Sequence, residues 1–191
     1  MAEMNRSMRQ RMVAGDDYLA DDPELVEMLA TSFAFMDRYN ATATSDVEGQ
    51  REILSAWLGS VGEEVTIRPP FRVDYGVNLY VGDRVFANFG LTALDVCEIT
   101  IGDDAQIGPN VSILTPLHPI DAERRREKWE YGAPVAIGSN VWIGGGAKIL
   151  PGVSIGDNTV IGAGSVVARD IGDNVVAVGN PARVVRHLDE E

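Results

Sequence analysis

The chain has 191 residues, of which 45% are hydrophobic, enough for one core with a helical attachment. Its formal net charge of −13 repels phosphate backbones and anionic lipids, which excludes nucleic acid and membrane surfaces as expected partners. No apolar stretch is long enough to span a membrane, and the first residues lack the apolar core of a signal peptide, so we expect a cytoplasmic protein.

The first 64 residues are expected to form a helical region. Asp22 is a good N-cap and Pro23 suits the first helical position, which predicts a helix over about 23–40. The apolar side chains expected to pack against the rest of the fold, and not to bind a ligand, are Leu25, Leu29, Phe33, Phe35, Met36 and Trp57.

Two further helices are expected in this region. Ser45 and Glu48 have the spacing of a capping box, which predicts a helix over about 46–59. A shorter helix is expected over residues 5–14.

Aliphatic residues then recur every six positions. A helix repeats its apolar face every 3.6 residues and a strand every two, so a period of six predicts short strands separated by regular corners. The clearest run consists of Ile137, Ile143, Ile149, Ile155, Ile161 and Val167. A run in the same phase consists of Ile101, Ile107 and Ile113. The pattern predicts a parallel β-helix over residues 65–180, with three six-residue sides in each coil.

The start of the repeat is out of phase with the rest. This first run consists of Val81, Ala87, Ala93 and Ile99, and it is displaced by two residues from the later runs. The displacement predicts a small insertion near residues 96–98. The single cysteine, Cys97, lies there; it has no partner for an intrachain disulfide, and we expect it to be a small core residue.

The repeat breaks at residues 114–134, which are too polar and irregular to form a coil. We expect this segment to leave the β-helix as a loop, and loops on rigid scaffolds often carry the chemistry. It contains His118, between Pro116 and Pro119, which we predict to be a general base because the pKa of histidine lies nearest neutrality. The arginine run at residues 124–126 is expected to be a solvated face, with a phosphate contact left open.

The end of the chain, residues 181–191, is expected to be a tail or short helix that caps the solenoid. It contains His187, the only other histidine, for which a solvated role is sufficient. Two histidines far apart in the sequence and one cysteine give no ligand set with zinc spacing, so no metal site is expected.

Several segments resemble the maltose and galactoside O-acetyltransferases, which belong to the hexapeptide-repeat acyltransferases. They are FRVDYGVNLYVGDRVFANFG, LHPID, and AIGSNVWIGGGAKILPGVSIGDNTVIGAGSVVARDI followed by GNPARVV. The N-terminal AGDDYLADDPELV also resembles that family, so the likeness covers nearly the whole chain.

The resemblance implies a left-handed parallel β-helix that assembles as a homotrimer with active sites between subunits. Acetyl-CoA is the implied co-substrate and a sugar or glycoside the implied acceptor. His118 then corresponds to the catalytic base, and Asn88 to the residue that contacts the acceptor or the oxyanion. The implied acceptor-side residues are Asp74, Phe86, Asn88 and Glu130. The implied coenzyme-binding residues are Gly145, Ala163, Ala168, Arg169, Arg183 and Arg186.

The chain departs from the galactoside pattern at two places. Gly145 stands where that enzyme has a serine near the coenzyme, and Ala20 aligns at or near an aspartate that touches sugar, with Asp21 and Asp22 adjacent. Glu130 could accept a hydrogen bond from the acceptor or the histidine, or form a salt bridge with a neighbouring arginine.

Alternatives to sugar acetylation remain at this stage. The same scaffold serves acyltransferases for other small acceptors, such as an antibiotic, serine or an amino-sugar nucleotide. A non-catalytic assembly subunit is a second alternative, and it predicts no binding of coenzyme A. A carbonic anhydrase of this architecture is disfavoured, because its zinc site needs three histidines.

Overall fold

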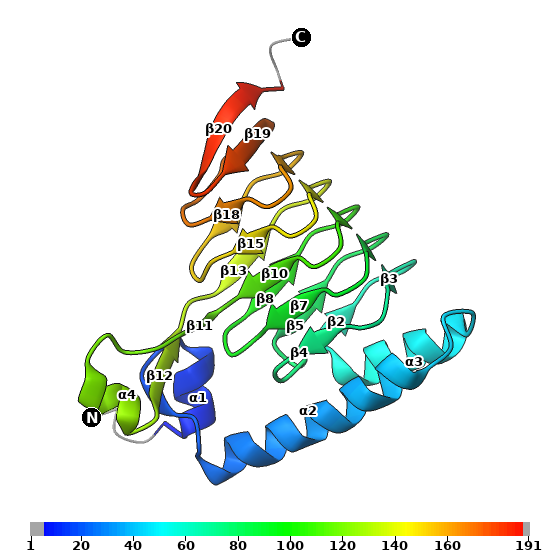
Figure 1. The fold of residues 1–191 in the computed structure, drawn as a ribbon. Helices are drawn as coiled ribbons and strands as arrows, with labels where there is room; N and C mark the ends of the chain where they lie inside the picture. Colours follow the sequence, from blue (N-terminus) through cyan, green and yellow to red (C-terminus); the bar gives the residue numbers. More distant parts are fainter. Residues whose placement is uncertain (1–5, 189–191) are drawn as a thin grey trace.

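The computed structural model describes residues 6–188 and shows a three-sided prism of stacked coils with helices across one end (Figure 1). Each coil contributes one short strand to each of three parallel sheets, which we call the first, second and third faces. The first face consists of β2 (Ser60–Val61), β5 (Leu79–Val81), β8 (Ile99–Ile101), β13 (Val135–Ile137) and β16 (Ser154–Ile155). The prediction of a parallel β-helix is confirmed, with about six turns.

The other two faces complete the coils. The second face consists of β3 (Thr66–Ile67), β6 (Phe86–Ala87), β9 (Gln106–Ile107), β14 (Trp142–Ile143), β17 (Val160–Ile161) and β19 (Val175–Gly179), extended by β20 (Ala182–His187). The third face consists of β4 (Arg72–Val73), β7 (Thr92–Leu94), β10 (Ser112–Leu114), β15 (Lys148–Ile149) and β18 (Val166–Val167). We call the turns after these faces the first, second and third corners. The solenoid begins at Ser60, five residues earlier than the repeat alone predicts, because β2 already pairs with β5.

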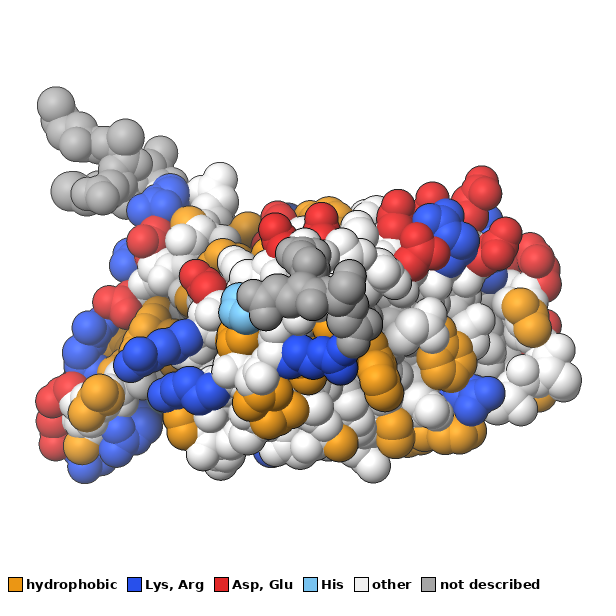
Figure 2. All heavy atoms as spheres, turned by 90° about the horizontal axis from the view of Figure 1, so that it is seen from above, with side chains coloured by type: hydrophobic (Ala, Val, Ile, Leu, Met, Phe, Trp, Pro, Cys, Tyr) orange, Lys and Arg blue, Asp and Glu red, His pale blue; other side chains and the backbone are white. Residues whose placement is uncertain are grey.

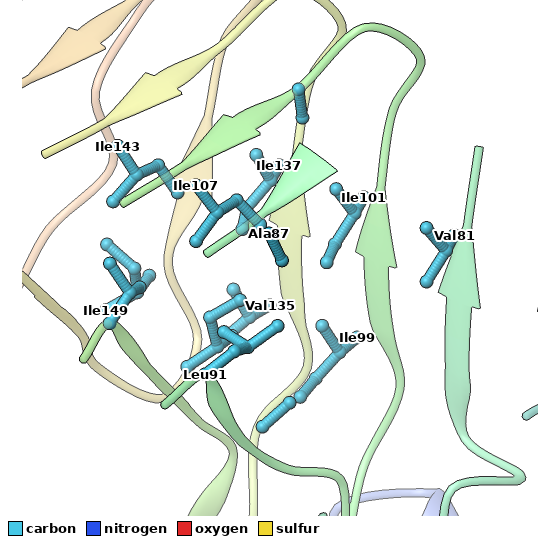
Figure 3. Close-up of a cluster of buried hydrophobic side chains, with 14 of the residues drawn as sticks. Val81, Ala87, Leu91, Ile99, Ile101, Ile107, Val135, Ile137, Ile143 and Ile149 are labelled. Carbon is cyan, nitrogen blue, oxygen red and sulfur yellow. The ribbon is translucent and has the colours of Figure 1, made fainter. Parts of the chain in front are cut away.

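The six-residue period arises from side chains stacked inside the prism, as the close-up in Figure 3 shows. On the second face Ala87 lies beside Ile107, Ile107 beside Ile143, and Ile143 beside Ile161. All four side chains are at most 1% exposed. Burial of one such isoleucine stabilises the fold by roughly 1.5–3 kcal/mol, so the stack is the main source of stability.

Every enlargement of a coil occurs at the third corner. Val81 lies beside Ile101, whereas Ile137 lies beside Ile155, so the early coils are two residues longer than the later ones. The additional residues are at 74–78 and 95–98, which confirms the predicted insertion. The excursion at residues 115–134 leaves from this same corner, so chemistry can be added there without disturbing the stack.

Helices α2 (Pro23–Ala41) and α3 (Val47–Trp57) cover the open end of the core. The short helix α1 (Met8–Val13) packs instead at the third corner, in a cluster that includes Val96 and Cys97. The side chain of Asp22 accepts a hydrogen bond of 3.0 Å from the backbone N–H of Glu24, as the N-cap prediction requires. Helix α3 is instead capped by Asp46, which accepts from Gly49, so the assignment of Ser45 was wrong by one residue.

Helix α2 buries Leu25 and Met36 as predicted, but not Phe33. Leu25, Met36 and Tyr39 are buried together with Ser32, whereas Phe33 is 42% exposed. The reason is a hydrogen bond of 2.9 Å from Nε1 of Trp57 to the Ser32 hydroxyl, which places a small polar residue against the indole. Phe33 is therefore turned outward, and the expectation that it packs on the prism was wrong.

The excursion forms a small subdomain beside the prism. It contains β11 (Pro116–Leu117), α4 (Ala122–Arg126) and β12 (Trp129–Gly132), and β12 also pairs with the N-terminal strand β1 (Tyr18–Leu19). Figure 1 shows α1, α4 and β12 grouped at one side of the solenoid. Residues far apart in the sequence are thereby joined at the third corner.

The end of the described chain differs from the prediction. Residues 182–187 form β20, antiparallel to β19, where a tail or short helix was expected; residues 189–191 lie outside the described part. The open edge of β19 offers backbone partners, and Ala182 is buried against it. Within residues 6–188, no helix has both the length and the apolar character needed to cross a bilayer.

Replacing Ile143 by alanine tests the stacked core. This side chain is 0% exposed, so we expect the free energy of unfolding to fall by about 2–5 kcal/mol. Urea unfolding measures the change. Val185→Ala is the control, because Val185 is 61% exposed and its truncation should alter stability by less than about 0.5 kcal/mol. Equal losses in the two variants would contradict the assigned role of the stack.

Candidate active site

His118 lies in the excursion from the third corner, directly after β11. Its side chain is 59% exposed, and its Nδ1 lies 3.7 Å from Oε1 of Glu130 on β12. Strands β11 and β12 are antiparallel, which brings the two side chains to the same end of the subdomain. A half-exposed imidazole with one nitrogen facing a carboxylate has the arrangement of an oriented base.

Glu130 is held from the other side by Tyr18. The tyrosine hydroxyl donates to Oε2 of Glu130 at 2.7 Å, and Tyr18 is only 1% exposed. Glu130 thus has one oxygen towards the histidine and one towards the tyrosine. Within residues 6–188, no arginine is within salt-bridge distance of Glu130, so of the predicted alternatives the contact with the histidine is the one found.

The arginine run supports the loop that carries His118. Arg125 donates through Nη1 to the backbone oxygens of Pro119 at 2.7 Å and Ile120 at 2.9 Å. Arg124 pairs with Asp17 at 2.9 Å and Arg126 pairs with Glu123. These three arginines therefore stabilise the excursion, a role that the sequence did not indicate.

Two further carboxyl groups lie at the third corner, close to Glu130. Asp74 directly follows β4; burial, with the charges of Asp95 and Glu130, raises its pKa to about 7. Asp95 is fully buried and accepts backbone hydrogen bonds from Tyr75 at 2.8 Å and Asn78 at 3.1 Å. Burial raises the pKa of Asp95 to about 6, although these hydrogen bonds oppose the rise. Asp95 was missed from sequence, because nothing in the repeat distinguishes it.

The aspartates near Ala20 have other surroundings. Asp22 caps α2, and Ala20 packs against the apolar cluster that includes Tyr18 and Tyr75. Ala20, expected at or near the position of the sugar-contacting aspartate, is therefore a packing residue here.

A second set of predicted residues meets on the second face and the second corner. Phe86, Asn88, Gly145 and Ala163 line one groove of about 460 Å³. Trp142, which is 58% exposed, forms part of its lining. The groove runs across several coils, as an elongated ligand would require.

Glycines form the floor of this groove above Asn88. Because Ala87 lies beside Ile107 and Ile107 beside Ile143, the residues that follow them stack in the order Asn88, Gly108, Gly144. A Cβ at Gly144 would lie 2.5 Å from the backbone nitrogen of Ala163, and one at Gly108 would lie 2.5 Å from that of Gly145. The spacing of the coils therefore excludes larger residues, and the bare backbone gives a ligand close access.

The side-chain amide of Asn88 has a fixed direction. Its Oδ1 accepts from the backbone N–H of Phe89 at 2.9 Å and from Arg68 at 3.5 Å. The guanidinium of Arg68 lies 5.1 Å from the ring centroids of both Phe86 and Phe89. Since both donors meet the oxygen, the Nδ2 hydrogens are directed elsewhere and can donate to a ligand. Arg68 was also missed, because the repeat does not indicate that its side chain contacts Asn88.

A single chain does not bring the two sets together. His118, Asp74 and Glu130 are at the third corner, whereas Asn88 and the groove are on the second face, and the third face lies between them. Ala168 and Arg169 are exposed and follow β18, at the third corner beyond the excursion.

The C-terminal arginines lie on β20. Arg183 is exposed and donates to the backbone oxygen of Ala182 at 2.8 Å, and Arg186 lies opposite Val176 in the β19–β20 hairpin. Both are therefore at the end of the second face that continues from the groove.

Acidic side chains gather along one edge of the molecule in Figure 2. The first corner carries a ladder in which the side chain of Asp83 accepts from the backbone of Glu63, Asp103 from Asp83, and Asp173 from Asp157. Arg84 pairs with Asp104 at 2.7 Å in the same corner. This concentration of negative charge disfavours a polyphosphate ligand there, which leaves the second and third corners for one.

Residues suited to metal binding or nucleophilic attack are not grouped at the site. Among residues 6–188, no three His, Cys, Asp or Glu side chains are placed to hold one metal ion. Cys97 is buried, its thiol donates to the backbone oxygen of Met12 at 3.2 Å, and burial raises its pKa to about 11. These properties fit the core role predicted for this residue.

Asp74→Asn tests the raised pKa of Asp74. A carboxyl whose pKa is higher in the folded state stabilises the protein fully below pH 4, and this contribution is lost as pH rises through about 7. The stability of the wild type relative to Asp74→Asn should therefore fall between about pH 5 and pH 8. Urea unfolding of both proteins at the two pH values measures it, and a constant difference would contradict the assignment.

Comparison with known proteins finds relatives that match nearly the whole chain. Residues 11–62 match the maltose acetyltransferase hexapeptide capping motif, and residues 134–169 match the bacterial transferase hexapeptide model of six repeats. The galactoside O-acetyltransferase of Escherichia coli K12 is 40% identical over 187 residues, covering 98% of this chain and 92% of that protein. Nodulation protein L of Rhizobium meliloti is 48% identical over 181 residues, covering 95% and 99%.

Solved structures show the same relationship. A maltose O-acetyltransferase from Clostridium difficile 630 superposes with a TM-score of 0.95 at 46% identity, covering 97% of this chain and 99% of that one. A galactoside acetyltransferase in complex with coenzyme A gives a TM-score of 0.92 at 40% identity, covering 96% and 92%. With the hexapeptide prism, the capping helices and the groove in place, the chain belongs to the maltose and galactoside O-acetyltransferase family and is an acetyltransferase that uses acetyl-CoA.

Proposed function

We propose that this protein transfers the acetyl group of acetyl-CoA directly to a hydroxyl of a sugar or glycoside, with His118 as the general base. The observation that carries the proposal is the half-exposed imidazole of His118, whose Nδ1 faces Oε1 of Glu130. Among residues 115–120 of the loop, His118 is the only side chain of a type that serves as a general base.

In the proposed reaction, Nε2 of His118 accepts the proton of the acceptor hydroxyl as that oxygen forms a bond to the thioester carbonyl carbon. The carbon–sulfur bond then breaks, and His118 returns the proton to the departing thiolate sulfur. The acetyl group moves from sulfur to oxygen without a covalent intermediate on the protein. Proton transfer of this kind commonly contributes a factor of about 10²–10⁴ to the rate.

Asn88 is the proposed donor to the oxyanion of the tetrahedral intermediate. Its Oδ1 is occupied by Phe89 and Arg68, so the Nδ2 hydrogens are oriented before the substrate arrives. Donors fixed in advance stabilise developing charge without reorganisation, and loss of one such donor commonly costs about 3–4 kcal/mol.

The coenzyme is proposed to lie along the glycine floor of the groove. The small residues Gly145 and Ala163 leave room for an extended arm, and Gly145 offers no hydroxyl to it. Arg183 and Arg186 on β20, with Arg169 at the third corner, are the cations proposed to offset the phosphates. Coenzyme A in the related galactoside enzyme supports this assignment.

The acceptor is proposed to lie near His118, between Asp74 and Glu130 of one subunit and Phe86 and Asn88 of the next subunit. Carboxyl groups and an amide suit a ligand rich in hydroxyls, and an aromatic ring can pack on the apolar face of a sugar. The names of the maltose and galactoside relatives support a sugar acceptor. Profiling of maltose, galactosides, serine and an antibiotic with labelled acetyl-CoA would identify the preferred acceptor.

A homotrimer with active sites between subunits is proposed because one chain holds only half of each site. His118 projects from the third corner, and the groove with Asn88 is on another face. In a ring with cyclic symmetry, the third corner of one subunit can face the groove of the next, which forms three equivalent sites.

Replacement of His118 by alanine tests the base. We expect kcat to fall at least about a hundredfold, because the hydroxyl loses its proton acceptor, while the dissociation constant for coenzyme A changes little. Steady-state kinetics and calorimetry measure the two quantities. His187→Ala is the matched control and should retain full turnover. Undiminished activity in the His118 variant would exclude it as the base.

Co-expression of the His118→Ala and Asn88→Ala chains tests the site between subunits. Each variant alone should be nearly inactive. A mixed trimer, however, contains an interface at which one subunit supplies an intact His118 and the next subunit supplies an intact Asn88. Random mixing should restore about a quarter of wild-type activity if the two residues act across a subunit boundary. Differently tagged chains allow the mixed trimers to be purified. No recovery in verified mixed trimers would mean that the residues act within one chain.

A further inference from the structure

Tyr18 is a buried, hydrogen-bonded tyrosine at the candidate site with no part in the proposed reaction. It is 1% exposed and lies 112 positions from Glu130 in the sequence, yet its hydroxyl donates to Oε2 of that residue at 2.7 Å. The hydroxyl of Tyr39, which is also buried, donates instead to the backbone oxygen of Ile67. Tyr18 is bonded to the carboxylate that faces His118.

The N-terminal segment is built to hold Tyr18 in this place. Strand β1 pairs with β12 so that Tyr18 lies directly opposite Glu130. Asp17 fixes the approach of the strand, because its backbone oxygen accepts from Nε of Arg11 at 2.6 Å and its carboxylate pairs with Arg124 at 2.9 Å. The hydroxyl is therefore located by contacts on both sides and not by the tyrosine ring alone.

The proton positions follow from the donors and acceptors. Burial and the neighbouring Glu130 raise the pKa of Tyr18, so its hydroxyl keeps its proton and must donate. Oε2 of Glu130 is occupied by that bond, and Oε1 is left facing Nδ1 of His118 at 3.7 Å. A carboxylate oxygen can only accept, so the neutral imidazole is favoured with its proton on Nδ1 and a bare Nε2.

We propose that Tyr18 is a positioning residue for acetyl transfer: its hydroxyl orients Glu130 so that His118 holds its proton on Nδ1 and presents Nε2 to the acceptor. The inference rests on the proposed role of His118 as base. It makes the N-terminal strand part of the catalytic apparatus, because the orientation of the base depends on β1 being paired with β12. The tyrosine itself does not touch the substrate.

The chain has only two histidines, so their NMR signals can be assigned with one variant. The full-length protein is labelled with ¹⁵N-histidine, and its imidazole nitrogens are observed by NMR at about pH 8.5, where a histidine with an ordinary pKa is neutral. His187→Asn assigns the remaining signals to His118. In the wild type we expect the Nδ1-protonated form to predominate.

Tyr18→Phe removes only the hydroxyl. We expect His118 to shift towards the Nε2-protonated form and kcat to fall about tenfold, while the KM for acetyl-CoA is unchanged. Glu130→Gln provides a second variant in case the first folds poorly. Its amide oxygen can still accept from Tyr18, which turns the amide N–H towards His118 and should invert the tautomer preference.

Tyr39→Phe is the matched control. It also removes a buried tyrosine hydroxyl with a hydrogen bond, but that bond is to the backbone oxygen of Ile67 beneath α2. This variant should lose stability and leave the His118 nitrogen signals and kcat unchanged. The comparison separates an effect on the base from a general effect of a lost buried hydrogen bond.

An unchanged nitrogen pattern and unchanged kcat in folded Tyr18→Phe would overturn the inference, as would the same pattern change in Tyr39→Phe. A wild-type protein with His118 protonated on Nε2 would also overturn it. Because the NMR measurement needs no turnover, it stands apart from the proposed function. The His118 tautomer could change in Tyr18→Phe while activity survives His118→Ala. That pair of results would support the positioning by Tyr18 and reject His118 as the base.

Discussion

The stacking of aliphatic side chains at the spacing of the coils is the constraint on which the rest of the structure depends. The column from Ala87 through Ile107, Ile143 and Ile161 allows no change in the length of a face. Additional residues can leave only at corners, and here they leave at the third corner alone. The candidate base, its carboxylate neighbour and the buried aspartates are found there for this reason, because it is the place where the chain can depart from the repeat.

Much of the fold follows from the sequence because the period of six has few structural solutions. The strands, the insertion next to Cys97 and the excursion with His118 are all consequences of that period or of its interruption. Details that depend on one partner were not predictable. Ser32 is buried and Phe33 is exposed, because Nε1 of Trp57 donates a hydrogen bond to the Ser32 hydroxyl. Residues 182–187 form a strand because β19 offers an open edge.

The candidate site divides in the same way. Phe86, Asn88, Gly145 and Ala163 were assigned by resemblance, and they do line one groove. Tyr18 could not be found from sequence, since it meets Glu130 through a strand pairing over 112 positions. Arg68 lies one coil below Asn88, where the period places it, but the period does not say that its side chain contacts the amide. Periodicity describes the scaffold, whereas side-chain contacts such as these depend on the particular partners.

The glycine floor restricts how this protein could acquire a new preference. Substitutions at Gly108 or Gly144 would force adjacent turns of the solenoid apart, so the proposed coenzyme surface cannot change its side chains without loss of the scaffold. Residues on the excursion and at its base have no such restriction. Divergence towards another acceptor, in nature or in the laboratory, should therefore occur through substitutions on the excursion, while the glycine floor stays unchanged.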